Sequence, residues 1–148
     1  MKLSTSHVIH FVIASVVIAA VSLAQWRPHD PTKVDRVQRF GSVIGIKPEK
    51  IEYYKQLHAN TWPGVLEQIS KANIRNYNIF LKQVDEEHWY LFSYFEYVGD
   101  DFEADMKRIA ADPETQRWWQ ETDPCQIPIP TRAEGEWWAT MERVFFHP

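Results

Sequence analysis

Residues 75–98 read RNYNIFLKQVDEEHWYLFSYFEYV, and this stretch decides the fold. Two runs rich in aromatic and β-branched residues, 75–84 and 88–98, flank an acidic triplet at 85–87, which is typical of an antiparallel hairpin with a solvated turn. Alternate residues of a strand face opposite sides of a sheet. Both sides of the second run are apolar, so we expect helices to cover one face of the sheet and a partner to cover the other.

The segment before this hairpin predicts a strand followed by a broken helix. Residues 39–46 alternate as in a strand and place Gly41 and Gly45 on one face, where a bulky group could approach closely. Residues 48–73 have helical character. The helix must break or kink at Trp62-Pro63, because a proline inside a helix removes a hydrogen-bond donor and clashes with the preceding turn.

The segment after the hairpin predicts helices and a last strand. Asp100-Asp101 is a helix N-cap, and Asp112-Pro113 begins a second helical stretch. Residues 125–135 are expected to form a long loop, and residues 138–146 the last strand. The order strand, helix, strand, strand, helix, strand is the split βαβ arrangement of a ferredoxin-like α+β domain. A symmetric homodimer that packs sheet against sheet would cover the remaining apolar face.

Composition excludes several classes of function. The chain has 148 residues and a formal net charge of -4, without a run of Lys or Arg that could bind nucleic acid. Its one cysteine, Cys125, can neither close an intramolecular disulfide nor form a Cys-based metal site. No metal-ligand spacing, phosphate-binding Gly-rich loop or Ser nucleophile motif is present in the sequence.

The N-terminal residues are set apart from this domain. Residues 8–24 read VIHFVIASVVIAAVSLA and, together with Lys2, predict a signal peptide over residues 1–24. An uncleaved N-terminal membrane anchor and a buried core helix are the alternatives. Residues 25–38 are expected to be a linker and residues 39–148 the folded domain, which would then be exported and work in the periplasm, outside the cell or attached to the membrane by residues 1–24.

One helical stripe carries the candidate chemistry. Tyr54, His58 and Trp62 are spaced four residues apart and would project from one side of a helix. They could be core residues with a hydrogen-bonded histidine between them. However, the pairs Asn76-Tyr77 and Trp118-Trp119 could border the same hollow. Aromatic walls with a few hydrogen-bonding groups suit a sugar.

The motif Y-x3-H-x3-W-P at residues 54–63 resembles the L-rhamnose mutarotase family. The other motifs of this resemblance occur in the family's order and are Asn76-Tyr77, Ala111-Asp112-Pro113, Gln116-Arg117-Trp118-Trp119 and residues 142–146. The resemblance covers residues 39–148. It implies a dimeric α+β barrel and an enzyme that interconverts the α and β anomers of L-rhamnose without a cofactor.

The resemblance also implies roles for single residues. His58 would be the catalytic proton donor, and Tyr54, Tyr77, Trp118 and Trp119 would bind the sugar. Histidine suits this chemistry because its ordinary pKa lets it give or take a proton near neutral pH. Residues 123–138 depart from the family's pattern and could change the preference among L-rhamnose, L-fucose and related sugars. A sugar-binding module without catalysis and another α+β-barrel enzyme, such as a cofactor-free monooxygenase, are the alternatives.

Overall fold

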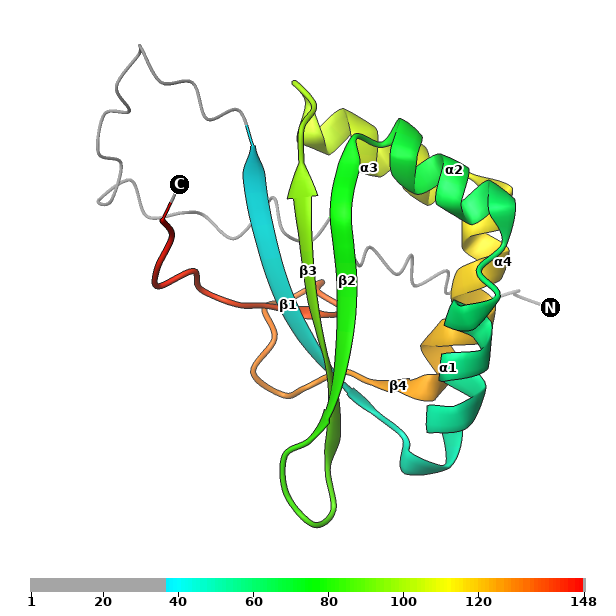
Figure 1. Cartoon of the computed structure of the whole chain (residues 1–148), viewed down its shortest axis with the longest axis vertical. Coiled ribbons are helices and arrows are strands. Elements are labelled where there is room, and N and C mark those ends of the chain that lie inside the picture. The colour runs from blue at the N-terminus through cyan, green and yellow to red at the C-terminus, as the bar shows by residue number, and fades with distance from the viewer. Residues whose placement is uncertain (1–36, 148) are drawn as a thin grey trace, which may run out of the picture.

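The computed structural model describes residues 37–147 as one α+β domain with helices along one side of a curved antiparallel sheet (Figure 1). The sheet order is β2-β3-β1-β4, and β5 also pairs with β1. The strands are β1 (Gln38–Ile46), β2 (Ile74–Gln83), β3 (Trp89–Tyr97), β4 (Gln126–Ile127) and β5 (Ala139–Thr140). The helices are α1 (Ile51–Ala59), α2 (Pro63–Lys71), α3 (Phe102–Ala111) and α4 (Pro113–Thr122), with 3-10 turns at Pro48–Lys50 and Asp123–Cys125. The predicted ferredoxin-like α+β class is confirmed.

The helix boundaries follow the local sequence signals. Pro63 is the first residue of α2, and Trp62 before it has an extended backbone, so the break expected at Trp62-Pro63 separates α1 from α2. The Asp101 side chain accepts a hydrogen bond from the backbone N–H of Ala104 and caps α3. Asp112 caps α4 in the same way. Each cap satisfies an N–H group that the helix itself leaves without a partner.

A β-bulge in β2 decides which side chains face the helices. The register with β3 shifts by one residue between Arg75 and Asn78, and Asn76 has a positive φ of 49°. Strict alternation would place Ile74 and Tyr77 on opposite faces. The extra residue brings both to the helix side, where Ile74 packs in the core and Tyr77 borders a cavity. Phe80 lies on the opposite face and is 59% exposed.

The core on the helix side has two parts. One surrounds Ile44 and Leu91, and the other surrounds Phe95 and Met106. Between them, at the middle of β1 and β3, the hydroxyls of Ser42 and Ser93 share a hydrogen bond of 2.6 Å. These small side chains fill less space than the aliphatic residues on either side.

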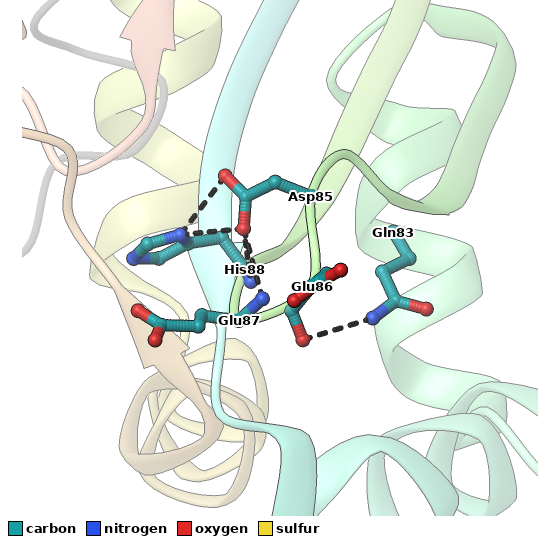
Figure 2. A network of polar contacts seen from close by, with 5 residues as sticks. All are labelled: Gln83, Asp85, Glu86, Glu87 and His88. Atoms are coloured by element: carbon teal, nitrogen blue, oxygen red, sulfur yellow. Dashed lines mark hydrogen bonds and ion pairs between the residues drawn. The ribbon is translucent and has the colours of Figure 1, made fainter.

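The turn between β2 and β3 is organised by one carboxylate (Figure 2). Asp85 Oδ1 accepts hydrogen bonds from the backbone N–H groups of Glu87 and His88 and from the His88 ring. The backbone N–H of Glu87 and the His88 ring hold the pKa of Asp85 below its ordinary value. The turn is exposed, as the acidic triplet predicts.

The prediction of a last strand over residues 138–146 is wrong for most of its length. Only Ala139 and Thr140 pair with β1, followed by a hydrogen bond of 2.8 Å from Met141 N to Gly41 O. The chain then leaves the sheet on the side away from the helices (Figure 1), and Val144 is 89% exposed. β-Propensity reflects packing on a sheet, and these residues have no neighbouring strand within the described part of the chain. The predicted loop, in turn, contributes the short strand β4.

The predicted signal peptide or membrane anchor at residues 1–24 lies outside the described residues. So does the predicted linker at residues 25–38, except for its last two residues, and Gln38 already belongs to β1. Within residues 37–147, none of the helices combines the length and the apolar character needed to cross a membrane.

Candidate functional site

A cavity of about 400 Å³ lies between α1, α2 and the helix side of the sheet. Most of its wall is aliphatic and comes from the three long strands and both helices. The aliphatic residues are Ile46, Ile51, Leu66, Ile69, Ile79, Leu81 and Leu91. The polar groups are those of Tyr54, Lys55, His58, Thr61 and Tyr77. Mostly apolar walls with a few directed polar groups are typical of a small-molecule site.

His58 is held in one orientation and one tautomer. Its Nδ1 lies 2.9 Å from the backbone carbonyl oxygen of Tyr54, one helical turn earlier. Because a carbonyl oxygen can only accept, Nδ1 carries the hydrogen, and Nε2 of the neutral ring carries a free lone pair. Burial lowers the pKa of His58 below its ordinary value of 6.5, although the hydrogen bond to Tyr54 acts in the opposite direction. The ring is therefore neutral near pH 7 and presents a base at Nε2.

Aromatic rings support His58 on two sides. Its ring stacks on that of Tyr54 with centroids 4.2 Å apart. The Trp118 ring meets His58 edge-on at 5.2 Å and also meets Trp62 edge-on at 5.4 Å. Tyr54, His58 and Trp62 thus stay close together although α1 ends before Trp62, because the Trp118 ring of α4 contacts both His58 and Trp62.

The two tyrosines stay protonated. Burial raises the pKa of Tyr54 far above its ordinary value, and the neighbouring Tyr77 hydroxyl raises it further. Desolvation around the Tyr77 hydroxyl raises its pKa to about 12. The residue is nevertheless 38% exposed, so the rest of its side chain is not fully buried. Both phenols can donate a hydrogen bond to a ligand at any physiological pH.

The structure brings together only part of the predicted set. Tyr54, His58 and Tyr77 border the cavity, whereas neither Trp118 nor Trp119 is among the described residues that line it. Trp118 is buried behind His58, and Trp119 is half-buried. The predicted sugar-binding role of the two tryptophans therefore stays a prediction.

Two groups of residues at the site were not predicted. The aliphatic wall contributed by Ile79 and Leu81 could have been found, since they alternate with Tyr77 along one strand. Gln126 and Trp137, which lie behind Tyr54, carry no recognisable signal in the sequence. Both belong to residues 123–138, for which the sequence predicts an effect on sugar preference but no role for any single residue.

These features define a ferredoxin-like α+β domain with a ligand-sized cavity in which a neutral histidine stands beside two protonated tyrosines. The family model described as L-rhamnose mutarotase matches residues 39–147. The L-rhamnose mutarotase of Bacillus subtilis is 34% identical over 88 residues, which are 60% of this chain and 79% of that protein. The chain therefore belongs to the L-rhamnose mutarotase family, and the resemblance read from the motifs is confirmed.

Solved structures share the fold. A crystal structure of L-rhamnose mutarotase from Formosa agariphila superposes with a TM-score of 0.57 and 20% identity, covering 75% of this chain and 99% of that one. Tetracenomycin F2 cyclase from Streptomyces glaucescens, a polyketide cyclase, superposes with a TM-score of 0.53 and 15% identity over the same shares. At these identities the similarity shows a common fold only, and the chemistry has to be inferred from the residues of the site.

The comparisons correct one expectation. The prediction that the domain is exported is wrong, because the rhamnose mutarotases of its family are cytoplasmic enzymes. That prediction depended on residues 1–24 alone, on Lys2 and the apolar run at residues 8–24.

Proposed function

We propose that this protein interconverts the α and β anomers of L-rhamnose, or of a related deoxy sugar, by opening and reclosing the sugar ring at His58. Family membership supports the activity. The observation that carries the assignment to His58 is its hydrogen bond to the Tyr54 carbonyl, because this contact leaves Nε2 of a desolvated neutral ring as the free base.

Mutarotation needs one proton removed from the anomeric hydroxyl and one delivered to the ring oxygen. In the proposed reaction, His58 Nε2 accepts the first proton while the bond between C1 and the ring oxygen breaks. The Tyr54 or Tyr77 hydroxyl donates a hydrogen bond to the ring oxygen or relays the second proton to it. The C1–C2 bond then rotates, the aldehyde turns its other face, and reclosure returns both protons.

The aliphatic wall favours a deoxy sugar. A 6-deoxyhexose exposes a methyl group and the C–H groups of its ring, which can pack on Leu66, Ile79 and Leu81. One well-placed acid or base accelerates a reaction by about 10²–10⁴-fold. That gain is useful for a reaction that already proceeds slowly in water.

The test is anomer exchange measured by saturation-transfer NMR on L-rhamnose, with the full chain, the His58→Gln variant and the matched control His88→Gln. His88 lies on the exposed β2–β3 turn (Figure 2) and is not among the described residues that line the cavity. We expect exchange above the buffer rate in the wild type and in His88→Gln, and a fall of about 10²-fold or more in His58→Gln. Equal exchange in wild type and His58→Gln would refute the catalytic role of His58.

A sugar-binding module without catalysis is not favoured, since the chain belongs to a family of isomerases. The same experiment separates the two functions. A binding module would show saturable sugar binding with no exchange above the buffer rate, for L-rhamnose and for L-fucose alike. That result would refute the proposed enzyme.

We also propose that the protein is a homodimer in which the sheet face opposite the helices packs against its copy. Tyr90, Phe92 and Tyr94 are half-buried on this face, and Phe80 is largely exposed beside them. A face this apolar normally meets a partner. Sedimentation analysis should give a dimer for the wild type and a monomer for Phe92→Arg. A folded wild-type monomer at micromolar concentration would contradict the proposal.

A further inference from the structure

A chain of three side chains extends from the C-terminal segment to the Tyr54 hydroxyl. The Trp137 indole Nε1–H donates to Gln126 Oε1 at 2.6 Å. Gln126 Nε2 in turn lies 3.5 Å from the Tyr54 hydroxyl oxygen, a long contact between two side chains that are 6% and 5% exposed. Gln126 and Tyr54 are 72 residues apart in the sequence, so only the fold brings them together.

Each contact in this chain has a direction that chemistry dictates. An indole N–H can only donate, so the amide atom 2.6 Å from it is the oxygen of Gln126. The amide nitrogen must therefore face Tyr54, and an NH₂ group can only donate. Consequently the Tyr54 oxygen accepts from Gln126, and the hydrogen of its own hydroxyl is left for another acceptor. Within residues 37–147, Gln126 is the hydrogen-bond partner of this hydroxyl.

We propose that Trp137 and Gln126 are positioning residues that direct the Tyr54 O–H into the cavity, where it donates a hydrogen bond to an oxygen of the sugar. The inference rests on the proposed function and deepens it. It makes the Tyr54 hydroxyl a hydrogen-bond donor in a fixed direction. It also gives residues 123–138, which depart from the family's pattern, a role in orienting that hydroxyl.

The backbone keeps Gln126 in place. Gln126 pairs with Ile46, the last residue of β1, and Lys47 N donates to Cys125 O at 2.9 Å. Gly45 permits this pairing, since a Cβ there would lie 2.9 Å from Ile127 O. β4 is thus fixed at the end of β1, shortly before α1 begins, and Gln126 lies against the residue of α1 that it orients.

The decisive variant is Gln126→Glu. A carboxylate keeps the size of the amide and can still accept from Trp137, but it also accepts from Tyr54 and would turn the hydroxyl hydrogen away from the cavity. Trp137→Phe removes the group that fixes the amide and allows it to rotate. Gln83→Glu makes the same amide-to-carboxylate change on the exposed end of β2 and is the matched control.

The first measurement is a double-mutant cycle on the anomer exchange rate of L-rhamnose. We expect Gln126→Glu and Tyr54→Phe each to lower the rate by about tenfold, the size of one lost hydrogen bond, and the double variant to be no slower than Tyr54→Phe alone. Gln83→Glu should match the wild type. If Gln126→Glu slows a Tyr54→Phe enzyme by a further tenfold, Gln126 does not act through Tyr54 and the proposal is overturned.

The second measurement does not depend on activity. In ¹H–¹⁵N spectra of the wild type, the Trp137 indole signal should lie downfield, and Tyr54→Phe should shift the side-chain amide signals of Gln126. Unshifted Gln126 amide signals in a folded Tyr54→Phe variant would refute the positioning role. If these signals shift but the wild type exchanges no sugar, the proposed function fails while the hydrogen-bond chain stands.

Discussion

The buried carboxylate of Asp105 offers the strongest prediction about stability. Its Oδ2 accepts hydrogen bonds of 2.7 Å from the Tyr97 hydroxyl and from Asn73 Nδ2, and its Oδ1 pairs with the Arg108 guanidinium. Asp105 is 4% exposed and Tyr97 is fully buried. The contacts join α3 to the end of β3 and to the turn between α2 and β2.

The magnitude follows from these contacts. A hydrogen bond to a charged group contributes about 1.5–3 kcal/mol, and an exposed ion pair such as that with Arg108 adds about 0–1 kcal/mol. Asp105→Ala removes both buried bonds and leaves the hydrogen of the Tyr97 hydroxyl without its carboxylate acceptor, so that only the hydrogen bond from the Asp101 backbone N–H remains on this hydroxyl. We therefore expect the free energy of unfolding to fall by about 3–7 kcal/mol, a large part of the about 5–15 kcal/mol that stabilises a typical domain.

Urea unfolding monitored by tryptophan fluorescence would measure this loss. The control is Asp101→Ala, which removes only the cap of α3 and should cost about 1 kcal/mol. An Asp105→Ala protein no less stable than Asp101→Ala would refute the reasoning.

Burial would raise the pKa of Asp105, but the hydrogen bonds from Asn73 and Tyr97 and the charge of Arg108 outweigh it and hold the pKa below its ordinary value. The stabilisation is therefore fully present above about pH 4 and is lost as the pH falls through the lower folded-state pKa.

Two further predictions concern the site. Gly45→Ala places a Cβ 2.9 Å from the backbone oxygen of Ile127. We therefore expect this variant to displace β4 and to lower the free energy of unfolding by about 1–3 kcal/mol in the same urea assay. Unchanged stability would contradict the close approach of the two strands. Neutral His58 is the proposed base, and burial lowers its pKa. The rate of anomer exchange should therefore fall with decreasing pH only below pH 6.5. A pH–rate profile in the NMR assay with its midpoint at or above pH 6.5 would contradict the assignment.

Local chemistry made much of the fold predictable. A proline cannot lie inside a helix without breaking or kinking it, so Pro63 predicts a helix boundary and is the first residue of α2. Asp101 and Asp112 cap helices through contacts within their own turns. The alternation of residues 88–98 likewise gives the two faces of β3 without reference to the rest of the chain. These features depend on neighbours a few residues away, which the sequence shows directly.

The last strand was predicted wrongly for the opposite reason. Val144, Phe145 and Phe146 have the composition of a strand, but a strand forms only where another strand offers its backbone groups. Whether an edge is available is a property of the assembled sheet. The edge of β1 is shared by β4 and β5, and the described chain leaves it after Met141.

The sequence by itself determined the order of the three long strands and the helices, the helix break before Pro63 and the family, because these depend on local periodicity and on motifs. Only the tertiary structure decided how the site is assembled. The bulge at Asn76 turns Tyr77 toward the helices, Trp118 lies behind His58, and Gln126 reaches Tyr54 from 72 residues away. Such contacts join distant segments, and their directions follow from packing and hydrogen-bond geometry in three dimensions.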